Sequence, residues 1–336
     1  MDASDHRGVR DLQPGRPERR GAAGEDAVGR LYRGRRSLDH DVVDRAAAAD
    51  GARRQRTSAI IERVRTDGDG ALIALARELD GATLETIEVP RAELHSALDG
   101  LDPAVRAAME RAVRNIAAVH RTMLPRPIEF EVEAGVTVGR RADPLGTVGI
   151  YAPGGRAAYP SSVLMGAIPA RVAGVGSVIL CSPPSVGALP SAPVLAAAAL
   201  AGVDRVFAIG GAGAIAAMAF GTRSVPRVDR VVGPGNAYVA EAKLQLCGTV
   251  GIDAPAGPSE LLISAGADAP VDVVAREAIA QAEHDPLAAV VIVAQGEPSA
   301  RSIAAALREA LPRAARTAIV NVSFTSRGAL LWCDRL

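Results

Sequence analysis

From residue 148 onward, one pattern repeats along the chain: a short continuous run of apolar residues, a glycine turn, then a helix-length segment. Strands that are covered on both faces show such continuous runs, whereas half-exposed strands alternate apolar and polar residues. The first series has strand-like runs at 148–152, 178–181, 205–209 and 230–232. The second has strands at 261–264 and 290–294 and helices at 271–283 and 298–311. The repeat predicts an α/β protein with two Rossmann-like, doubly wound parallel-sheet domains.

The N-terminal part follows a different pattern. Apolar residues recur at helical spacing in 57–79 and 103–123, which predicts an N-terminal helical segment. Residues 83–89 are strand-like. Residues 128–133 and 135–141 alternate apolar and polar side chains, as in an antiparallel pair with one solvated face.

Residues 1–27 are rich in Arg, Asp, Gly and Pro and contain no apolar stretch, which predicts a disordered tail. We assign 28–147 together with 252–336 to a first α/β domain, incomplete at its C-terminus. Residues 148–251 form a second α/β domain.

Composition narrows the function classes. The 38 Lys and Arg residues balance 38 Asp and Glu residues, so the formal net charge of zero gives no indication of a nucleic-acid partner. No apolar run reaches the ~18 residues of a membrane span, so we expect no membrane partner. Cys181, Cys247 and Cys333 are odd in number and far apart. This spacing favours free thiols and a cytoplasmic protein.

Glycine-rich turns follow several of the strand-like runs. In open parallel sheets, ligands bind at the carboxyl ends of the strands, where glycines let the backbone approach and helix N-termini supply donors. Each turn alone is compatible with ordinary turn chemistry, but together they indicate a ligand site. The turns are Tyr151-Ala-Pro-Gly-Gly155, Gly210-Gly-Ala-Gly213, Gly233-Pro-Gly-Asn236 and Ala256-Gly-Pro-Ser-Glu260.

Residues 211–216 have the G-x-G-x-x-A spacing of a dinucleotide fingerprint and follow a strand. No acidic residue ends the following strand, where it would bind a ribose hydroxyl; Asp229 precedes that strand instead. The fingerprint and plain turn chemistry therefore remain alternatives at this position.

The stretch 280–286 contains His284, the only histidine after residue 120. On a helix, Gln281 and His284 would project from the same face, so one cation could bind the imidazole and the amide oxygen. Such a pair is more commonly hydrogen-bonded or solvated, because zinc needs about three or four ligands.

Taken together, these motifs resemble histidinol dehydrogenases over residues 40–336. The matching stretches occur in the family's order: 148–155, 159–174, 210–221, 232–236, 253–260 and 281–285. The resemblance implies a zinc-dependent enzyme that oxidises L-histidinol to L-histidine through L-histidinal, with two NAD molecules used in turn. This reaction is the last step of histidine biosynthesis.

The resemblance also implies roles for single residues. Gln281 and His284 match two zinc ligands that also face the substrate, and Ser259 matches a substrate contact. Tyr151 and Asn236 match NAD contacts, which implies that residues 148–251 bind NAD.

At one cofactor position the sequence departs from the family. Gly213 stands where the family commonly has a glutamine that contacts NAD, so only backbone donors remain there. The family forms homodimers whose active sites share residues between subunits, and a homodimer is expected here.

The family's Pro-Glu-His-Leu motif supplies the acid/base histidine and its glutamate, and it is expected to lie beyond Leu336. An Asp and a His that complete the zinc site are expected there too, which leaves no catalytic residue and an incomplete zinc site in this chain. We also expect the strand that begins at Ala329 to be unpaired, which points to a longer natural chain. Two alternatives remain: a paralogous zinc and NAD dehydrogenase of another small amino- or sulfo-alcohol, and an inactive remnant that binds nucleotide or a partner.

Overall fold

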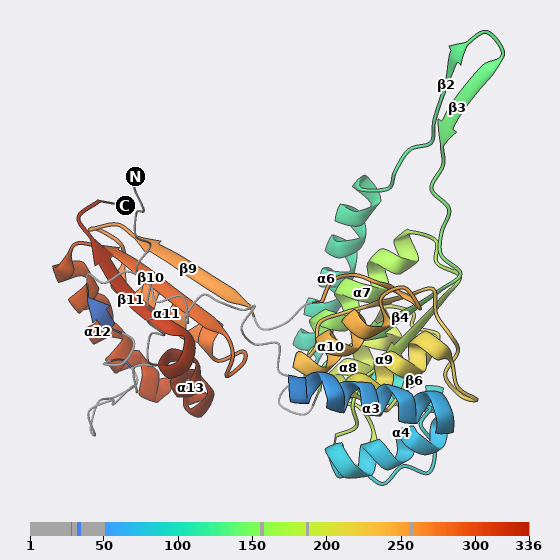
Figure 1. The fold of residues 1–336 in the computed structure, drawn as a ribbon, viewed down its shortest axis with the longest axis horizontal. Helices are drawn as coiled ribbons and strands as arrows, with labels where there is room; N and C mark the ends of the chain where they lie inside the picture. The colour runs from blue at the N-terminus through green and yellow to red at the C-terminus, as the bar shows by residue number, and fades with distance from the viewer. Residues whose placement is uncertain are drawn as a thin grey trace, which may run out of the picture. The chain divides into compact units, whose positions relative to one another are not determined.

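The computed structural model describes residues 28, 32–34, 51–154, 158–185, 188–255 and 259–335. The chain divides into two compact units (Figure 1). We call Arg45–Pro258 the central unit, and Met1–Asp44 with Ser259–Leu336 the C-terminal unit. The predicted tail at 1–27 lies outside the described residues.

The central unit is built on a parallel sheet in the order β6-β5-β4-β7-β8, which we call the central sheet. Its strands are β4 Thr147–Tyr151, β5 Ser177–Cys181, β6 Arg205–Phe207, β7 Arg230–Val232 and β8 Gly251–Ile252. The first strand in the chain, β4, lies in the middle. The chain winds outward from β4 to β6, then returns to the other side for β7 and β8. The predicted α/β class is confirmed, and the strand order reverses between β4 and β7.

Helices cover this sheet in two groups. α7 packs on α8, and both contact helices from the N-terminal segment, whereas α9 packs on α10 and α3. Since parallel crossovers are right-handed, winding in opposite directions from β4 places the two groups on opposite faces. The described helices are α3 Gly51–Asp67, α4 Asp69–Leu75, α5 Arg91–Asp99, α6 Pro103–Thr122, α7 Pro160–Val172, α8 Ala192–Leu200, α9 Gly211–Phe220 and α10 Ala237–Leu246, with a π-helical turn η2 at Ala76–Asp80.

The domain boundary differs from the sequence-based one, which placed 28–147 with 252–336. Helices α3 to α6 belong to the central unit. The apolar faces of α3 and α4, with Val64, Leu72 and Leu75, are buried in the same core as the central sheet. The predicted strand 83–89 is an irregular segment that follows the edge of β6, where the Val89 N–H donates to the Val206 carbonyl at 2.8 Å.

Strands β2 Ile128–Glu133 and β3 Val136–Arg140 form the predicted antiparallel hairpin, which projects away from the rest of its unit (Figure 1). We call this hairpin the arm. The sequence predicted one solvated face, but every residue of both strands is exposed. Phe130 on the apolar face is 54% exposed.

The C-terminal unit contains a second parallel sheet in the order β1-β11-β10-β9, the C-terminal sheet. The expectation that the last strand is unpaired is wrong. β11 lies between β10 and β1, where Tyr32 is in register with Leu330. The elements are β1 Tyr32–Gly34, β9 Glu260–Ala265, α11 Val271–Ala282, β10 Ala289–Gln295, α12 Glu297–Ala310, the 3-10 turn η4 Leu311–Arg313, α13 Thr317–Arg327 and β11 Gly328–Cys333.

Within the described residues, the longest helices lack the apolar length that a bilayer crossing requires.

Candidate functional site

Three of the glycine turns lie together at one edge of the central sheet. They follow β4, β6 and β7, and the carboxyl ends of parallel strands share one edge. This edge includes the point between β4 and β7 where the strand order reverses, the usual ligand position in doubly wound sheets. Three of the four turns that the sequence singled out therefore share one edge. Gly155 of the first turn and 256–258 of the fourth lie outside the described residues.

Tyr151, at the end of β4, is 3% exposed. Its hydroxyl oxygen accepts a hydrogen bond from the Gly211 N–H at 3.1 Å, so the phenol satisfies an amide at the N-terminus of α9. Burial raises the pKa of the phenol to about 12, which keeps it neutral at physiological pH. Tyr151 therefore fixes the relative positions of the turns after β4 and β6.

The turn after β7 approaches the same tyrosine. Gly233 has φ +112, and a Cβ added there would lie 2.1 Å from the Tyr151 carbonyl oxygen, so no side chain fits. Asn236 is the exposed N-cap of α10, and its side-chain oxygen accepts from the Tyr238 and Val239 amides at 3.0 and 3.1 Å. The structure thus brings Tyr151 and the Asn236 turn together.

Gly213 has a different environment. A Cβ at this position would lie 3.2 Å from Leu75 Cδ1 and 3.5 Å from Leu72 Cδ2, so the glycine lies in the packing of α9 against the N-terminal helices. The fingerprint-like stretch also follows β6, an edge strand, whereas the dinucleotide motif follows the first strand, here β4. Its role as a cofactor contact stays a prediction.

Sequence reasoning missed a buried ion pair at this edge. Lys243 of α10 is 1% exposed, and its Nζ donates to the Gly233 carbonyl at 2.5 Å and to Asp253 Oδ1 at 2.6 Å. Asp253 Oδ2 accepts from the Gly233 N–H at 2.8 Å. Burial alone would raise the pKa of the Asp253 carboxyl, but these hydrogen bonds outweigh it and hold that pKa below its usual value.

A signal for this pair was present in the sequence. Lys243 is the only lysine in the chain, and all the others of its 38 Lys and Arg residues are arginines. The exception to the chain's use of arginine singles out this position, because the ammonium and guanidinium groups are not interchangeable.

In the C-terminal unit, the predicted pair Gln281 and His284 does not lie on one helix. α11 ends at Ala282, and His284 lies beyond it. The helix ends because Pro286 disfavours helical geometry in the preceding Asp285, whose carboxylate instead accepts from the Leu287 amide at 2.8 Å. The His284 N–H donates to the Gln281 carbonyl at 3.4 Å, a tightened turn that keeps the two residues adjacent.

Ser259 lies near this pair in the fold. Its carbonyl accepts from the Ala289 N–H at 3.2 Å, where β9 and β10 begin to pair. Ser259 and the turn that contains His284 therefore lie at the amino edge of the C-terminal sheet. Sequence reasoning had looked for ligands at carboxyl ends.

The residues at this edge fit part of a metal site. His284 is exposed, and Gln281 Nε2 is buried with no hydrogen-bond partner among the described residues. Since amide oxygen and nitrogen are assigned from such partners, the opposite rotamer would present an unpaired buried acceptor, as a cation requires. Within the described residues, no cluster of three His, Cys, Asp or Glu side chains could hold a metal. The role of Gln281 and His284 as metal ligands stays a prediction, and the pair alone would give only two of the three or four ligands that zinc needs.

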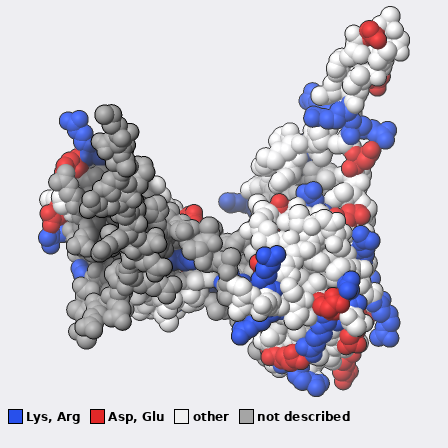
Figure 2. Space-filling model, viewed as in Figure 1, with Lys and Arg blue, Asp and Glu red and all other residues white. Residues whose placement is uncertain are grey.

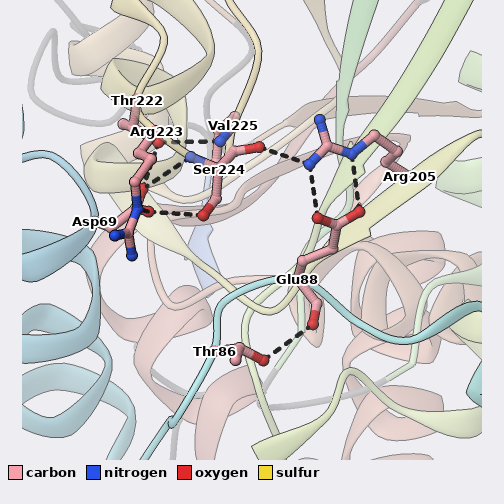
Figure 3. A network of polar contacts seen from close by, with 8 residues as sticks. All are labelled: Asp69, Thr86, Glu88, Arg205, Thr222, Arg223, Ser224 and Val225. Atoms are coloured by element: carbon pink, nitrogen blue, oxygen red, sulfur yellow. Dashed lines mark hydrogen bonds and ion pairs between the residues drawn. The ribbon is translucent and has the colours of Figure 1, made fainter.

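A second polar network lies at the opposite, amino edge of the central sheet (Figure 3). Arg205 donates to both carboxylate oxygens of Glu88 at 2.8 and 2.6 Å and to the Ser224 carbonyl at 2.8 Å. Asp69 accepts from the hydroxyls of Thr222 and Ser224 at 2.5 and 2.7 Å. Because Asp69 belongs to α4, these contacts fasten the N-terminal helices to the sheet, away from the glycine turns.

The histidinol dehydrogenase family model matches residues 43–336. The histidinol dehydrogenase of Pseudomonas syringae pv. tomato is 44% identical over 299 residues, which cover 88% of this chain and 66% of the relative. That of Bordetella parapertussis is 44% identical over 82% of this chain and 63% of its own length. The chain thus spans slightly less than two thirds of these relatives.

A solved structure agrees with these sequence matches. The crystal structure of histidinol dehydrogenase from Elizabethkingia anophelis superposes with a TM-score of 0.83 at 29% identity, over 92% of this chain and 72% of that one. The family model, the relatives and the shared fold lead to one conclusion: the chain belongs to the histidinol dehydrogenase family.

Proposed function

We propose that this protein carries out the zinc-dependent, NAD-linked oxidation of L-histidinol to L-histidine through L-histidinal. Family membership supports the reaction. The observation that carries the cofactor assignment is the meeting of Tyr151 and the Gly233–Asn236 turn where the strand order of the central sheet reverses. The free thiols of Cys181, Cys247 and Cys333 support a cytoplasmic location.

In the proposed reaction, each oxidation transfers a hydride from the substrate carbon to one NAD; the first releases one proton, and the second, which consumes a water, releases two. Water supplies the second oxygen of the carboxylate. Zinc, when bound, would acidify the substrate hydroxyl and polarise the aldehyde. Gln281 and His284 would hold the metal, and Ser259 at the same sheet edge would orient the amino alcohol. Tyr151 and Asn236 would position the cofactor through the turns they fix.

Turnover tests this function. The protein as its source cell makes it, purified and supplied with zinc, is expected to form NADH from L-histidinol, measured by NADH absorbance. NADH formation from another small amino alcohol but not from L-histidinol would favour the paralogue. Absence of NADH with every such substrate would contradict a dehydrogenase and favour the inactive remnant.

We also propose a homodimer in which the arm contacts a second copy. An isolated two-stranded hairpin is at best marginally stable in water, so its exposed apolar face needs a cover. Figure 2 shows acidic side chains toward the tip of the arm and a band of basic ones at its base. They include Glu131 and Glu133 near the tip and Arg126, Arg140 and Arg141 near the base. Two arms packed in opposite directions would pair these charges about a two-fold axis.

Opposite faces of the arm provide a matched test. Phe130 pairs with Val138 on the apolar face, and Thr137 pairs with Glu131 on the other. Phe130→Lys is expected to convert the dimer to a monomer in light scattering, because a charge would be buried in the interface. Thr137→Lys is expected to stay dimeric. A dimer that survives Phe130→Lys would contradict the role of the arm, and a monomeric wild type would contradict the dimer itself.

A further inference from the structure

We propose that Lys243 is a positioning residue for the cofactor turn Gly233–Asn236, acting through its ion pair with Asp253. The inference rests on the proposed function only in naming NAD as the ligand of that turn. Lys243 itself is almost completely buried, so it touches no ligand and acts through the backbone.

The contacts around Gly233 link the ion pair to the turn. Both polar groups of its peptide backbone are held by the ion pair: the carbonyl accepts from Lys243 and the N–H donates to Asp253. Lys243 and Asp253 also bond each other at 2.6 Å, which closes a ring of contacts. Gly233 has φ +112, and glycine has little conformational preference of its own, so we infer that these contacts hold the path of the turn.

The lysine side chain suits this position better than an arginine would. A guanidinium is planar and larger than an ammonium, and it presents its donors in a fixed fork. The buried ammonium group of Lys243, on α10, donates to both the Gly233 carbonyl and the Asp253 carboxylate. The use of the chain's only lysine at this position agrees with a geometric demand that arginine does not meet.

Asp253 lies at a junction in the chain. It follows β8, at the same carboxyl edge as Tyr151 and Gly233, and it begins the segment that leads to Ser259. The ion pair therefore ties the start of that segment to the turn that contains Asn236. Loss of the Lys243 or the Asp253 charge would release the Gly233–Asn236 turn from the ion pair, while β7 and α10 would stay in place.

The test compares Lys243→Met with Arg205→Met in the full chain. Both variants lose a cation bound to a carboxylate and a carbonyl, but Arg205 lies at the opposite edge of the sheet. Lys243→Met is expected to weaken NAD binding about tenfold in calorimetry, the effect of losing one charged hydrogen bond. It should also speed amide exchange in 233–239. Arg205→Met should lower the melting temperature and change neither.

Unchanged NAD affinity and exchange in Lys243→Met would overturn the inference, and so would an equal loss of affinity in Arg205→Met. If Lys243→Met does not fold, Asp253→Asn replaces it, with the same expected direction and the same overturning results. A wild type that binds no NAD would contradict the proposed function alone, because amide exchange still decides whether Lys243 positions the turn.

The NMR signal of the Lys243 ammonium group gives a second test of the proposal. Because the chain has one lysine, labelling with 15N-lysine gives a single side-chain ammonium signal. That signal is expected to shift when NAD is added, since the turn it holds contacts the ligand. An unmoved signal at saturating NAD would count against the inference.

Discussion

Gly233→Ala is expected to leave little folded central unit. The glycine has φ +112, a backbone conformation that costs an L-residue roughly 1–2 kcal/mol. Its added Cβ would also lie 2.1 Å from the Tyr151 carbonyl oxygen, which is backbone at the end of a buried strand and has no rotamer to change. The turn would have to leave Lys243 and Asp253. We expect a total loss of about 4 kcal/mol or more, a large part of a typical domain's stability.

Gly248→Ala is the matched control. Gly248 has φ +102, but a Cβ there would meet no atom within 4 Å, so only the backbone cost of about 1–2 kcal/mol remains. Urea unfolding followed by far-ultraviolet circular dichroism measures both variants. The single tryptophan, Trp332 in β11, reports the C-terminal unit separately by fluorescence. Equal losses in the two variants would contradict the steric argument.

Most strands of the two sheets were predictable because their signal is local. Continuous apolar runs such as 178–181 and 290–294 give β5 and β10, and their glycine turns fix the α/β class. The pairing of β11 with β1 was not predictable, because β1 comes from the opposite end of the chain and is only Tyr32–Gly34. The predicted domain boundary differs from that of the structure for a similar reason. The pattern of α3 and α4 shows an apolar face but not which core that face completes.

Helix α13 shows how tertiary contacts override local preference. Its stretch Thr317 to Val322 is rich in β-branched residues, which favour strands. Val320 and Phe324, one helical turn apart, are both fully buried in the C-terminal unit. The buried Ser323 hydroxyl donates to the Ala288 carbonyl at 2.9 Å. These contacts stabilise a helix that the sequence alone did not indicate.

The candidate site was predictable in residue type more than in geometry. The resemblance singled out Tyr151 and Asn236 as cofactor contacts; the structure brings their turns together, and the contacts themselves stay a prediction. Lys243 was missed because lysine side chains are almost never fully buried, so the sequence alone favours a solvated position. Gly154 and Gly210 have a local explanation that spacing cannot reveal: a Cβ at either position would clash with Pro183, at 2.8 and 2.6 Å. These glycines allow the turns to pack on one another.

Gln281→Met is expected to stabilise the metal-free protein while weakening its zinc binding. Gln281 Nε2 is buried and unpaired among the described residues, a state that costs about 1–3 kcal/mol. Methionine has a similar length and no polar group, so it removes that cost. The same change removes one of the two proposed zinc ligands. Four ligands share roughly 10–16 kcal/mol in structural sites, so losing one lowers affinity about 100-fold.

His284→Ala separates the two effects. His284 is exposed, so its removal should change the metal-free melting temperature little while weakening zinc binding to a similar extent. Zinc affinity is measured by competition with a chromophoric chelator, and stability by unfolding with and without zinc. His95→Ala, an exposed histidine on α5, should change neither quantity. If Gln281→Met destabilised the metal-free protein and left zinc affinity intact, the amide would be a structural group. Opposite signs of the two effects would mean that the chain keeps an unfavourable buried amide because a cation satisfies it.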